Sequence, residues 1–492
     1  MRPLRALLLI GSLVSCYSLA HAGAEVMAEF RDERGRTPEV LAHVPLKAVV
    51  AEFLDPLDTG LGKSLGYLLW RETLTAISDQ AGAGVIVAEA PPEERLVDML
   101  KRDYHRAALR IAKHQRARMS LWGAVEAEAG EVFINTYLSV LTKETQGDLR
   151  FALDKRFRGD AALRERMALG VSKGAALEAP ISRTRFNFAM QIRTDSELFQ
   201  RPIVTRQPLV IRTRSSKDAP VLGRTSSGER LDAIGMQGGW FKIQLEDGKT
   251  GYVSAGIDSA LDLPPRQVEA DRNNINLRAG PGTDHGILRN TNLKGSYKVL
   301  DMRYRQGKGL WYQIDMDGRP AWVAAFLVKP RFSVPAVHFL AGLYRYYAGR
   351  HKDAASEFQR FIDHSGQSPN NANLATAHQL LGASLLLDNQ TRRGYEAFSR
   401  AIQLTPYDPD AYLLRGVAAF GTRQAPAGLK DLDSALALDR RYRPARSLAQ
   451  AVKAIADGRD DMFMEHLTNL PRYKRDVDEV LQKHQLGLTS PQ

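Results

Sequence analysis

Apolar positions in residues 23–200 alternate between the spacing of strands and the spacing of helices. The strand-like runs are rich in β-branched, aliphatic and aromatic residues and lie at residues 46–53, 84–88, 117–125 and 132–140. The helix-like runs lie at residues 61–79 and 93–115, and the first of them repeats its leucines at helical intervals. This order of elements predicts a small α/β sandwich.

Two stretches between residues 203 and 330 share one order of short β-rich runs separated by glycine turns. The later copy reads LRAGPGT at 277–283, LWYQI at 310–314 and DGRPAWV at 317–323. The earlier copy reads VIRT at 210–213, GWFKI at 239–243 and DGKTGYV at 247–253. Arg278 follows Arg212 by 66 positions and Trp311 follows Trp240 by 71, so the copies keep their order. We expect two small closed β-barrels, at residues 203–258 and 266–330.

Residues 334–480 are rich in Ala, Leu and Tyr at helical spacing. One group of positions recurs after 34 residues: Gly382, Gly394, Phe398 and Ala401 become Gly416, Gly428, Leu432 and Ala435. An earlier unit carries Gly342, Ala354 and Phe358, separated by a polar loop. A 34-residue period predicts stacked pairs of helices.

These patterns resemble three known kinds of domain. The duplicated region resembles bacterial SH3 (SH3b) domains, more closely in its later copy, and the helical region resembles tetratricopeptide repeats (TPR). Residues 44–142 resemble the N-terminal domain of TolB-like proteins and CsgG-like domains, through the strand ending at Phe53, the helix around Leu65 and LWGAV at 121–125. The resemblances imply an α/β domain at 23–200, two SH3-like barrels and an all-α TPR solenoid.

The N-terminus has the three parts of a secretory signal: Arg2 and Arg5, an apolar run, and a small-residue site ending at Ala22. Cys16, the only cysteine, follows LVS and resembles the lipidated residue of a bacterial lipoprotein. Two alternatives therefore stay open: cleavage of residues 1–22, or cleavage of residues 1–15 with lipidation of Cys16. Either alternative predicts a periplasmic or outer-membrane-associated protein, with membrane attachment only through Cys16.

The chain is long enough for three or four domains, at 492 residues with 44% hydrophobic and 25% charged residues. Its formal charge of +12 falls to +10 when Arg2 and Arg5 leave with the signal. The cations are spread along the chain and no nucleic-acid motif is present, so we expect no nucleic-acid partner. No disulfide can form within a chain that has one cysteine.

Sequence motifs give little support for catalysis. The run GLGKS at 60–64 lacks the first glycine of a phosphate loop, so we interpret it as a helix start. The histidines form no metal motif, and no cysteine remains for a wall peptidase, so we predict no catalytic residue, metal or cofactor. An alternative in which the α/β domain is a hydrolase would need carboxylates near strand ends, namely Asp55, Asp58, Glu126 and Glu128.

Candidate binding residues come from both repeat regions. Aromatic and cationic side chains of the barrels either line a ligand groove or build the barrel: Trp240, Tyr252, Arg278, Trp311, Tyr312 and Trp322. For Arg212 and Arg278 the competing role is to fix a loop by hydrogen bonds. Polar residues proposed for a TPR groove are Asn389, Arg392 and Arg415.

We therefore expect an exported scaffold that binds peptidoglycan or a wall protein through SH3b modules and a protein partner through TPR repeats. Two alternatives are a subunit of an outer-membrane lipoprotein or secretion assembly and a regulator of a peptidoglycan enzyme.

Overall fold

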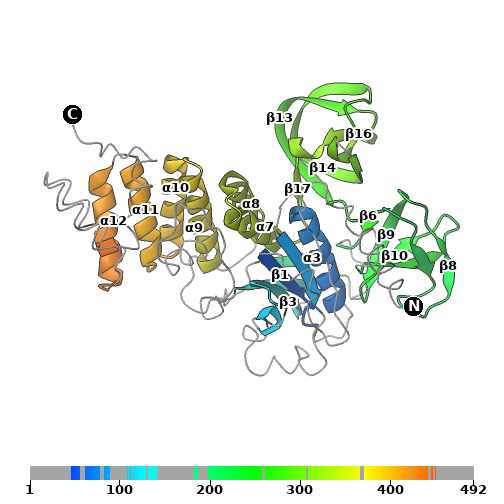
Figure 1. Ribbon diagram of the computed structural model, residues 1–492, viewed down its shortest axis with the longest axis horizontal. Helices are drawn as coiled ribbons and strands as arrows, with labels where there is room; N and C mark the ends of the chain where they lie inside the picture. The colour runs from blue at the N-terminus through cyan, green and yellow to red at the C-terminus, as the bar shows by residue number, and fades with distance from the viewer. Residues whose placement is uncertain are drawn as a thin grey trace, which may run out of the picture. The chain divides into compact units, whose positions relative to one another are not determined.

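The computed structural model describes part of the chain (Figure 1). The described residues are 46–55, 61–77, 83–88, 108, 110–113, 115–128, 131–140, 182–186, 198–256, 261–305, 308–365, 371–422, 424–441, 445–446 and 449. The signal segment, Cys16, Asp58 and most of the helix expected at 93–115 lie outside them. The chain forms two compact units, one from residues 1–136 and 184–337 and one from residues 137–183 and 338–492.

The first element group is a five-stranded sheet with a helix. Its elements are β1 (Leu46–Ala51), α3 (Leu61–Ile77), β2 (Ala83–Ala88), β3 (Met119–Glu128), β4 (Glu131–Val140) and β5 (Ser182–Phe186). The strand order is β2-β1-β3-β4-β5, with β1 parallel to β2 and to β3. The expected strands and the helix at 61–79 are confirmed within two residues at each described end, except that β3 extends three residues further, to Glu128. Strand β5 was not expected from the sequence. Leu65, Leu68 and Leu69 are fully buried, because the helical spacing gathers them on the packed side of α3.

The next group, which we name the first β-module, comprises residues 201–262. Its strands are β6 (Arg201–Thr205), β7 (Val210–Arg212), β8 (Val221–Arg224), β9 (Arg230–Gln237), β10 (Trp240–Gln244), β11 (Thr250–Ser254) and β12 (Leu261–Asp262). They form one sheet in the order β12-β6-β9-β10-β11-β7-β8. Gly238 and Gly239 both have positive φ in the tight turn between β9 and β10, a conformation that favours glycine. The sequence pattern did not predict β6 and β12.

The second β-module comprises residues 267–331. Its elements are β13 (Gln267–Arg278), β14 (Ile287–Arg305), β15 (Gly309–Met316), β16 (Arg319–Ala324), the short 3-10 helix η5 (Ala325–Leu327) and β17 (Lys329–Arg331). The strand order is β14-β15-β16-β13-β17, and β13 also pairs with β14, so the sheet closes on itself. Its core holds Val268, Leu277, Val299, Tyr312, Ile314 and Val323.

The helical region consists, in its described part, of α7 (Pro335–Tyr347), α8 (His351–His364), α9 (Asn371–Leu387), α10 (Thr391–Leu404), α11 (Pro409–Gly421) and α12 (Ala425–Leu438). Consecutive helices from α8 to α12 pack together in Figure 1. None of the helices within the described ranges is both long and apolar enough to span a membrane.

The repeat predicted from glycine and phenylalanine spacing is confirmed at the helix contacts. A Cβ placed on Gly342 would lie 2.7 Å from the Phe358 ring, and a Cβ placed on Gly382 would lie 2.7 Å from the Phe398 ring. In the third pair, Gly416 faces Leu432 at 3.4 Å. Glycine is thus required in the first two pairs, where one helix approaches the phenylalanine ring of the next.

Helix α3 joins the α/β sheet to the first β-module through a buried charged network. Arg71 donates to the backbone oxygens of Ala255 and Leu261, at 2.9 and 3.1 Å, and also to that of Gly256. The Glu72 carboxylate accepts from Arg201 Nη1 at 3.0 Å and from the hydroxyl of Ser333 at 2.6 Å. The side chains of Arg201 and Glu72 are 0% and 2% exposed. We name these four residues, Arg71, Glu72, Arg201 and Ser333, the α3 network.

Replacing Glu72 should destabilise this unit strongly. The Glu72→Ala variant leaves the Arg201 guanidinium buried without its carboxylate, a change that costs about 3–5 kcal/mol. Tryptophan fluorescence during urea unfolding measures this, because all five tryptophans lie in the unit that contains α3 and both β-modules.

The matched control is Asp232→Ala, which removes an exposed ion pair with Arg230 in the same unit. Exposed pairs contribute about 0–1 kcal/mol, so the control should unfold close to wild type. Equal midpoints for the two variants would contradict the role of the α3 network.

Candidate functional site

The outer face of the first β-module gathers aromatic and cationic side chains. Cross-strand register places Lys242 beside Tyr252, and Tyr252 beside Arg212. Side chains that are directly opposite in a sheet share one face. All three are half-buried, and so is Trp240, two residues from Lys242 on β10. We name these four residues, Arg212, Trp240, Lys242 and Tyr252, the aromatic face.

The alternating residues of β10 and β11 explain why this face stays open. Phe241, Ile243 and Val253 are fully buried on the opposite side of the strands, where they form the core. The remaining positions of β10 and β11 on the outer side are Gln244, Thr250 and Ser254, which are uncharged. The residues of β7, β10 and β11 on this side thus include cations and aromatic rings and no Asp or Glu of these three strands.

Helix α3 supports one end of the aromatic face. A Cβ placed on Gly239 would lie 3.0 Å from the Tyr67 ring, so this ring rests against the turn that precedes Trp240. The Ala255 N–H donates to the Gly239 oxygen at 2.9 Å, and Arg71 of the α3 network binds the Ala255 oxygen. The position of Trp240 thus depends on residues of the α/β sheet region.

Arg212 and Arg278 fix equivalent loops. Arg212 Nη1 donates to the Ala219 oxygen at 2.6 Å, and Arg278 Nη1 donates to the oxygens of Thr283 and His285 at 3.1 and 2.7 Å. Ala219 and His285 are 66 positions apart, the same interval that separates the two arginines. Of the two roles considered for Arg278 from the sequence, the hydrogen bonds show the one in which it fixes a loop.

The second β-module closes the corresponding aromatic positions. Trp311 and Trp322 are 4% and 7% exposed and pack with Ala324 and Leu327. The Trp311 indole N–H donates to the Lys308 oxygen at 2.9 Å. Tyr312 points to the other side of β15 and is 2% exposed within the core. These three rings build the module, which leaves Trp240 and Tyr252 as the accessible aromatic candidates.

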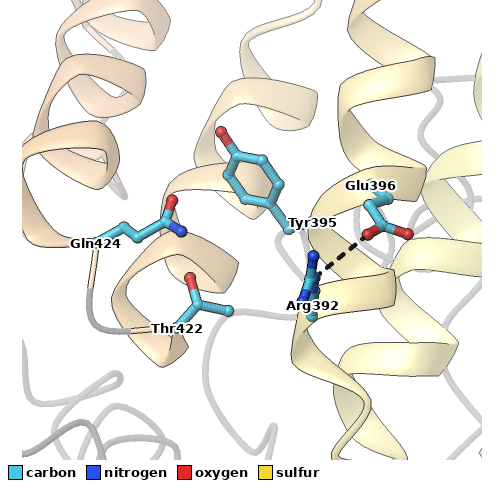
Figure 2. Close-up of a pocket in the computed structure, with 5 residues that line it drawn as sticks. All are labelled: Arg392, Tyr395, Glu396, Thr422 and Gln424. Carbon is cyan, nitrogen blue, oxygen red and sulfur yellow. Dashed lines mark ion pairs between the residues drawn. The ribbon is translucent and has the colours of Figure 1, made fainter.

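The helical unit contains a cavity of about 550 Å³, shown in Figure 2. Its lining residues are Arg392, Tyr395, Glu396, Thr422 and Gln424, which come from α10 and from the connection between α11 and α12. Arg392 and Glu396 form an ion pair at 3.7 Å, with side chains 91% and 65% exposed. Pairs this exposed are weak, so both charges are accessible to a partner.

Arg415 does not contribute a free charge to this cavity. Its guanidinium binds Asp431 through two contacts, at 2.6 and 2.9 Å, and lies 5.7 Å from the ring centroids of both Tyr395 and Tyr412. The hydrogen bond with Asp431 raises the pKa of Arg415. Arg415 therefore has a structural partner in Asp431 and lies near the Tyr395 ring, and it is not among the residues that line the cavity.

Asn389 has a local structural role. It lies in the turn between α9 and α10 with φ of +63°, and Gly349 occupies the equivalent turn between α7 and α8 with φ of +76°. Asparagine tolerates this left-handed conformation at helix ends better than most residues. Of the three predicted groove residues, Arg392 is the one that lines the cavity.

The start of α3 is occupied by a side chain of the protein. The Asp55 carboxylate accepts from the backbone N–H groups of Leu61 and Gly62, at 2.9 and 3.4 Å. This carboxylate takes the position at the helix N-terminus where a phosphate would bind, which supports the helix-start interpretation of GLGKS. Asp55 is thereby engaged, whereas Glu126 is exposed on β3.

A buried histidine and glutamate pair lies between α7 and α8. His338 Nδ1 is 2.7 Å from a Glu357 carboxylate oxygen, and Arg345 and Arg360 lie 3.6 and 3.5 Å from the other oxygen. Burial lowers the pKa of His338 to about 4. Arg345 and His338 hold the pKa of Glu357 at about 2 despite its burial. Within the described ranges, no group of three metal-ligating side chains is present.

Comparison with known proteins identifies one domain family. A family model described as a bacterial SH3 domain matches residues 208–257, within the first β-module. The match thus falls on the earlier copy, whereas the sequence pattern placed the closer resemblance in the later one. The spacing from Arg278 to Trp311 is 33 positions, against 28 from Arg212 to Trp240, so the later copy departs from the spacing of the matched copy. No curated protein matches the chain significantly.

Several solved structures share slight similarity. The crystal structure of MamA is 15% identical and covers 31% of this chain and 81% of its own, with a TM-score of 0.24. MamA 41-end from Desulfovibrio magneticus RS-1 is 21% identical, covers 29% and 77%, and has a TM-score of 0.24. NlpC2 from Trichomonas vaginalis is 14% identical, covers 28% and 50%, and has a TM-score of 0.15. TM-scores this low do not establish a shared fold.

Acid should destabilise the helical unit through His338. The unfolded histidine binds its proton near pH 6.5 and the folded one near pH 4, so the unfolded state binds more protons between these values. Stability should therefore fall as the pH drops from about 6.5 to about 4. Urea unfolding followed by far-UV circular dichroism at pH 7, 5 and 4 measures this.

The control is His338→Leu, which cannot titrate. Its loss of stability between pH 7 and pH 4 should be smaller than that of wild type. Some loss should persist, since burial also lowers the pKa of His378 to about 4. An identical loss in the two proteins would contradict the role of His338.

Proposed function

We propose that this chain is an exported cell-envelope scaffold that binds peptidoglycan or a wall protein through its β-modules and a protein partner through its helical repeats. In this proposal the second β-module is also an SH3-like barrel, the helical unit is a TPR solenoid, and the protein works without catalysis. The sequence features of a secretory signal support a location in the periplasm or at the outer membrane.

One observation carries the wall-binding function. The residues matched by the bacterial SH3 family are those that present the aromatic face. Aromatic rings provide stacking surfaces for sugar rings and peptide groups, and Lys or Arg side chains pair with carboxylates. Polymers of the cell wall carry sugar rings and peptide carboxylates together. The aromatic face combines the two complementary chemistries on one side of one sheet.

The helical cavity supports the second part of the proposal. Arg392, Glu396 and Tyr395 offer a cation, an anion and an aromatic ring within one cavity of about 550 Å³. Mixed polar and aromatic lining suits a segment of another protein. Charged side chains of that segment can replace the weak Arg392–Glu396 ion pair with ion pairs of their own.

Wall binding should depend on the aromatic face. The full chain should pellet with purified peptidoglycan sacculi in a saturable manner. Tyr252→Ala and Lys242→Gln each remove one half-buried contact group and should weaken binding by about tenfold, the equivalent of about 1.4 kcal/mol. The measurement is quantitative co-sedimentation, with folding checked by tryptophan fluorescence.

The full chain is needed because an isolated β-module would expose Arg201 and lose the α3 network. Tyr407→Ala is the matched control, since Tyr407 is 83% exposed in the helical unit. Wild-type pelleting with unchanged binding of both variants would contradict the aromatic face as the site. Absence of wild-type pelleting would contradict wall binding itself.

Partner binding should depend on the helical cavity. A photo-crosslinking residue at Gln424, which lines the cavity, should capture a defined envelope protein in cells that produce the chain naturally. The same residue at the exposed Asp433 of α12 is the control and should not. Arg392→Ala should abolish the Gln424 product, because it removes the accessible cation. Identical products from both positions would contradict the cavity as the partner site.

A further inference from the structure

Both β-modules contain the same irregularity at the start of the strand that follows the arginine-fixed loop. In the first, Arg212 pairs with Val221 and Ile211 pairs with Gly223, which leaves Leu222 as an extra residue. In the second, Arg278 pairs with Ile287 and Leu277 pairs with Arg289, which leaves Leu288 as an extra residue. The extra residue of a β-bulge is re-aimed relative to its neighbours. Each module thus places a leucine in a bulge, 66 positions apart.

These bulges expose aliphatic side chains. Val221 and Leu222 are 57% and 43% exposed, and Ile287 and Leu288 are 53% and 59% exposed. They are four of the eight large hydrophobic residues exposed in the described part of the chain. Single exposed apolar residues are ordinary, but two adjacent ones at the same register position of two modules are a repeated feature of the surface. We name the pairs Val221–Leu222 and Ile287–Leu288 the leucine bulges.

Each leucine bulge has a cation beside it. Arg224 lies two positions after Leu222 on β8, and Arg289 directly follows Leu288 on β14; the two arginines are at different register positions, and both are exposed. Neither forms an ion pair with any residue that the structure describes. The acid of the loop before the second bulge, Asp284, is already engaged by Lys308 at 2.8 Å and by Arg305 at 3.4 Å. Arg224 and Arg289 are therefore available to an external carboxylate.

Space is open beside both bulges. β8 is the last strand in the sheet order of the first module, and β14 pairs only with β13 until Val299, where pairing with β15 begins. A Cβ placed on Gly223 or on Gly286, which flank the bulges, would meet no atom within 4 Å. An extended ligand can therefore approach the leucine and the arginine together.

We propose that the two leucine bulges are a pair of equivalent contact sites for carboxylate-bearing peptides that are displayed repeatedly along the wall polymer. This inference rests on the proposed wall-binding function and adds a second surface to the aromatic face. The aliphatic pair contacts apolar side chains of the peptide, and the neighbouring arginine binds its carboxylate. A repeated peptide satisfies two equivalent sites in one chain, which raises the overall affinity above that of either site alone.

The test compares Leu222→Ser, Leu288→Ser and the double variant in the full chain, each checked for folding by circular dichroism. The probe is intact sacculi. Each single variant should weaken pelleting by about tenfold, since each removes most of the apolar surface that one leucine buries on binding the wall. The double variant should lose substantially more than either single variant, because it also removes the avidity. Tyr407→Ser is the matched control for loss of an exposed apolar side chain.

Arg224→Gln and Arg289→Gln should also weaken pelleting and reduce its dependence on salt. Sacculi whose peptides have been removed by an amidase should bind wild type no better than they bind the double variant. Equal binding of wild type to intact and peptide-free sacculi would overturn the peptide as ligand.

Two outcomes separate this inference from the function on which it rests. If wild type pellets, Tyr252→Ala weakens binding and the double leucine variant binds like wild type, the inference falls and wall binding stands. If wild type does not pellet, both fall. Loss of binding to anionic lipid vesicles in the double variant, without loss of binding to sacculi, would overturn the inference in favour of a membrane surface.

Discussion

The buried pairing of Glu72 with Arg201 is the constraint on which the arrangement of the α/β sheet region and the first β-module depends. Two charges removed from water are tolerated when they pair with each other and with hydrogen-bonding groups. Glu72 meets this requirement with groups from Arg201 and Ser333, and Arg71 meets it with three backbone oxygens. The partners come from segments far apart in sequence, so the α/β region and the first β-module form one folded unit. The first β-module is therefore not an independently folded domain.

Duplication explains much of the remaining architecture. Differences between the copies indicate which residues are not needed for the fold and are therefore candidates for binding. Arg212 and Arg278 fix their loops in the same way, and Gly342 and Gly382 meet Phe358 and Phe398 at the same distance. The aromatic positions differ: Leu327 covers the pair in the second β-module, whereas Trp240 and Tyr252 stay half-exposed in the first. A structural requirement alone would be met by a closed aromatic pair, so the open pair is the more informative of the two.

Periodicity was enough to predict the strands β1 to β4 of the α/β region, the two β-modules and the helical pairs, because apolar residues at periods of 2 and 3.6 must gather on one face. It did not predict β5. It could not separate Tyr312 from Tyr252, since both alternate along a strand and the burial of each depends on which side faces the core. The roles of Asn389 and Arg415 were also out of reach. The first depends on a backbone dihedral and the second on Asp431, which lies 16 positions away. Strand β12, at one edge of its sheet, has two residues, too few to show an alternating pattern.

The shifted pKa values of His338 and Glu357 have a structural cause. Strongly shifted pKa values usually gather where a reaction needs a poised acid or base. The shifts of His338 and Glu357 belong to groups that are buried against each other between α7 and α8, where they hold two helices together. The exposed cations include Arg224, Arg289 and Arg392, which lie near aliphatic or aromatic side chains. In the proposed function such cations bind carboxylate-bearing chains, and a surface that repeats them gains affinity by repetition.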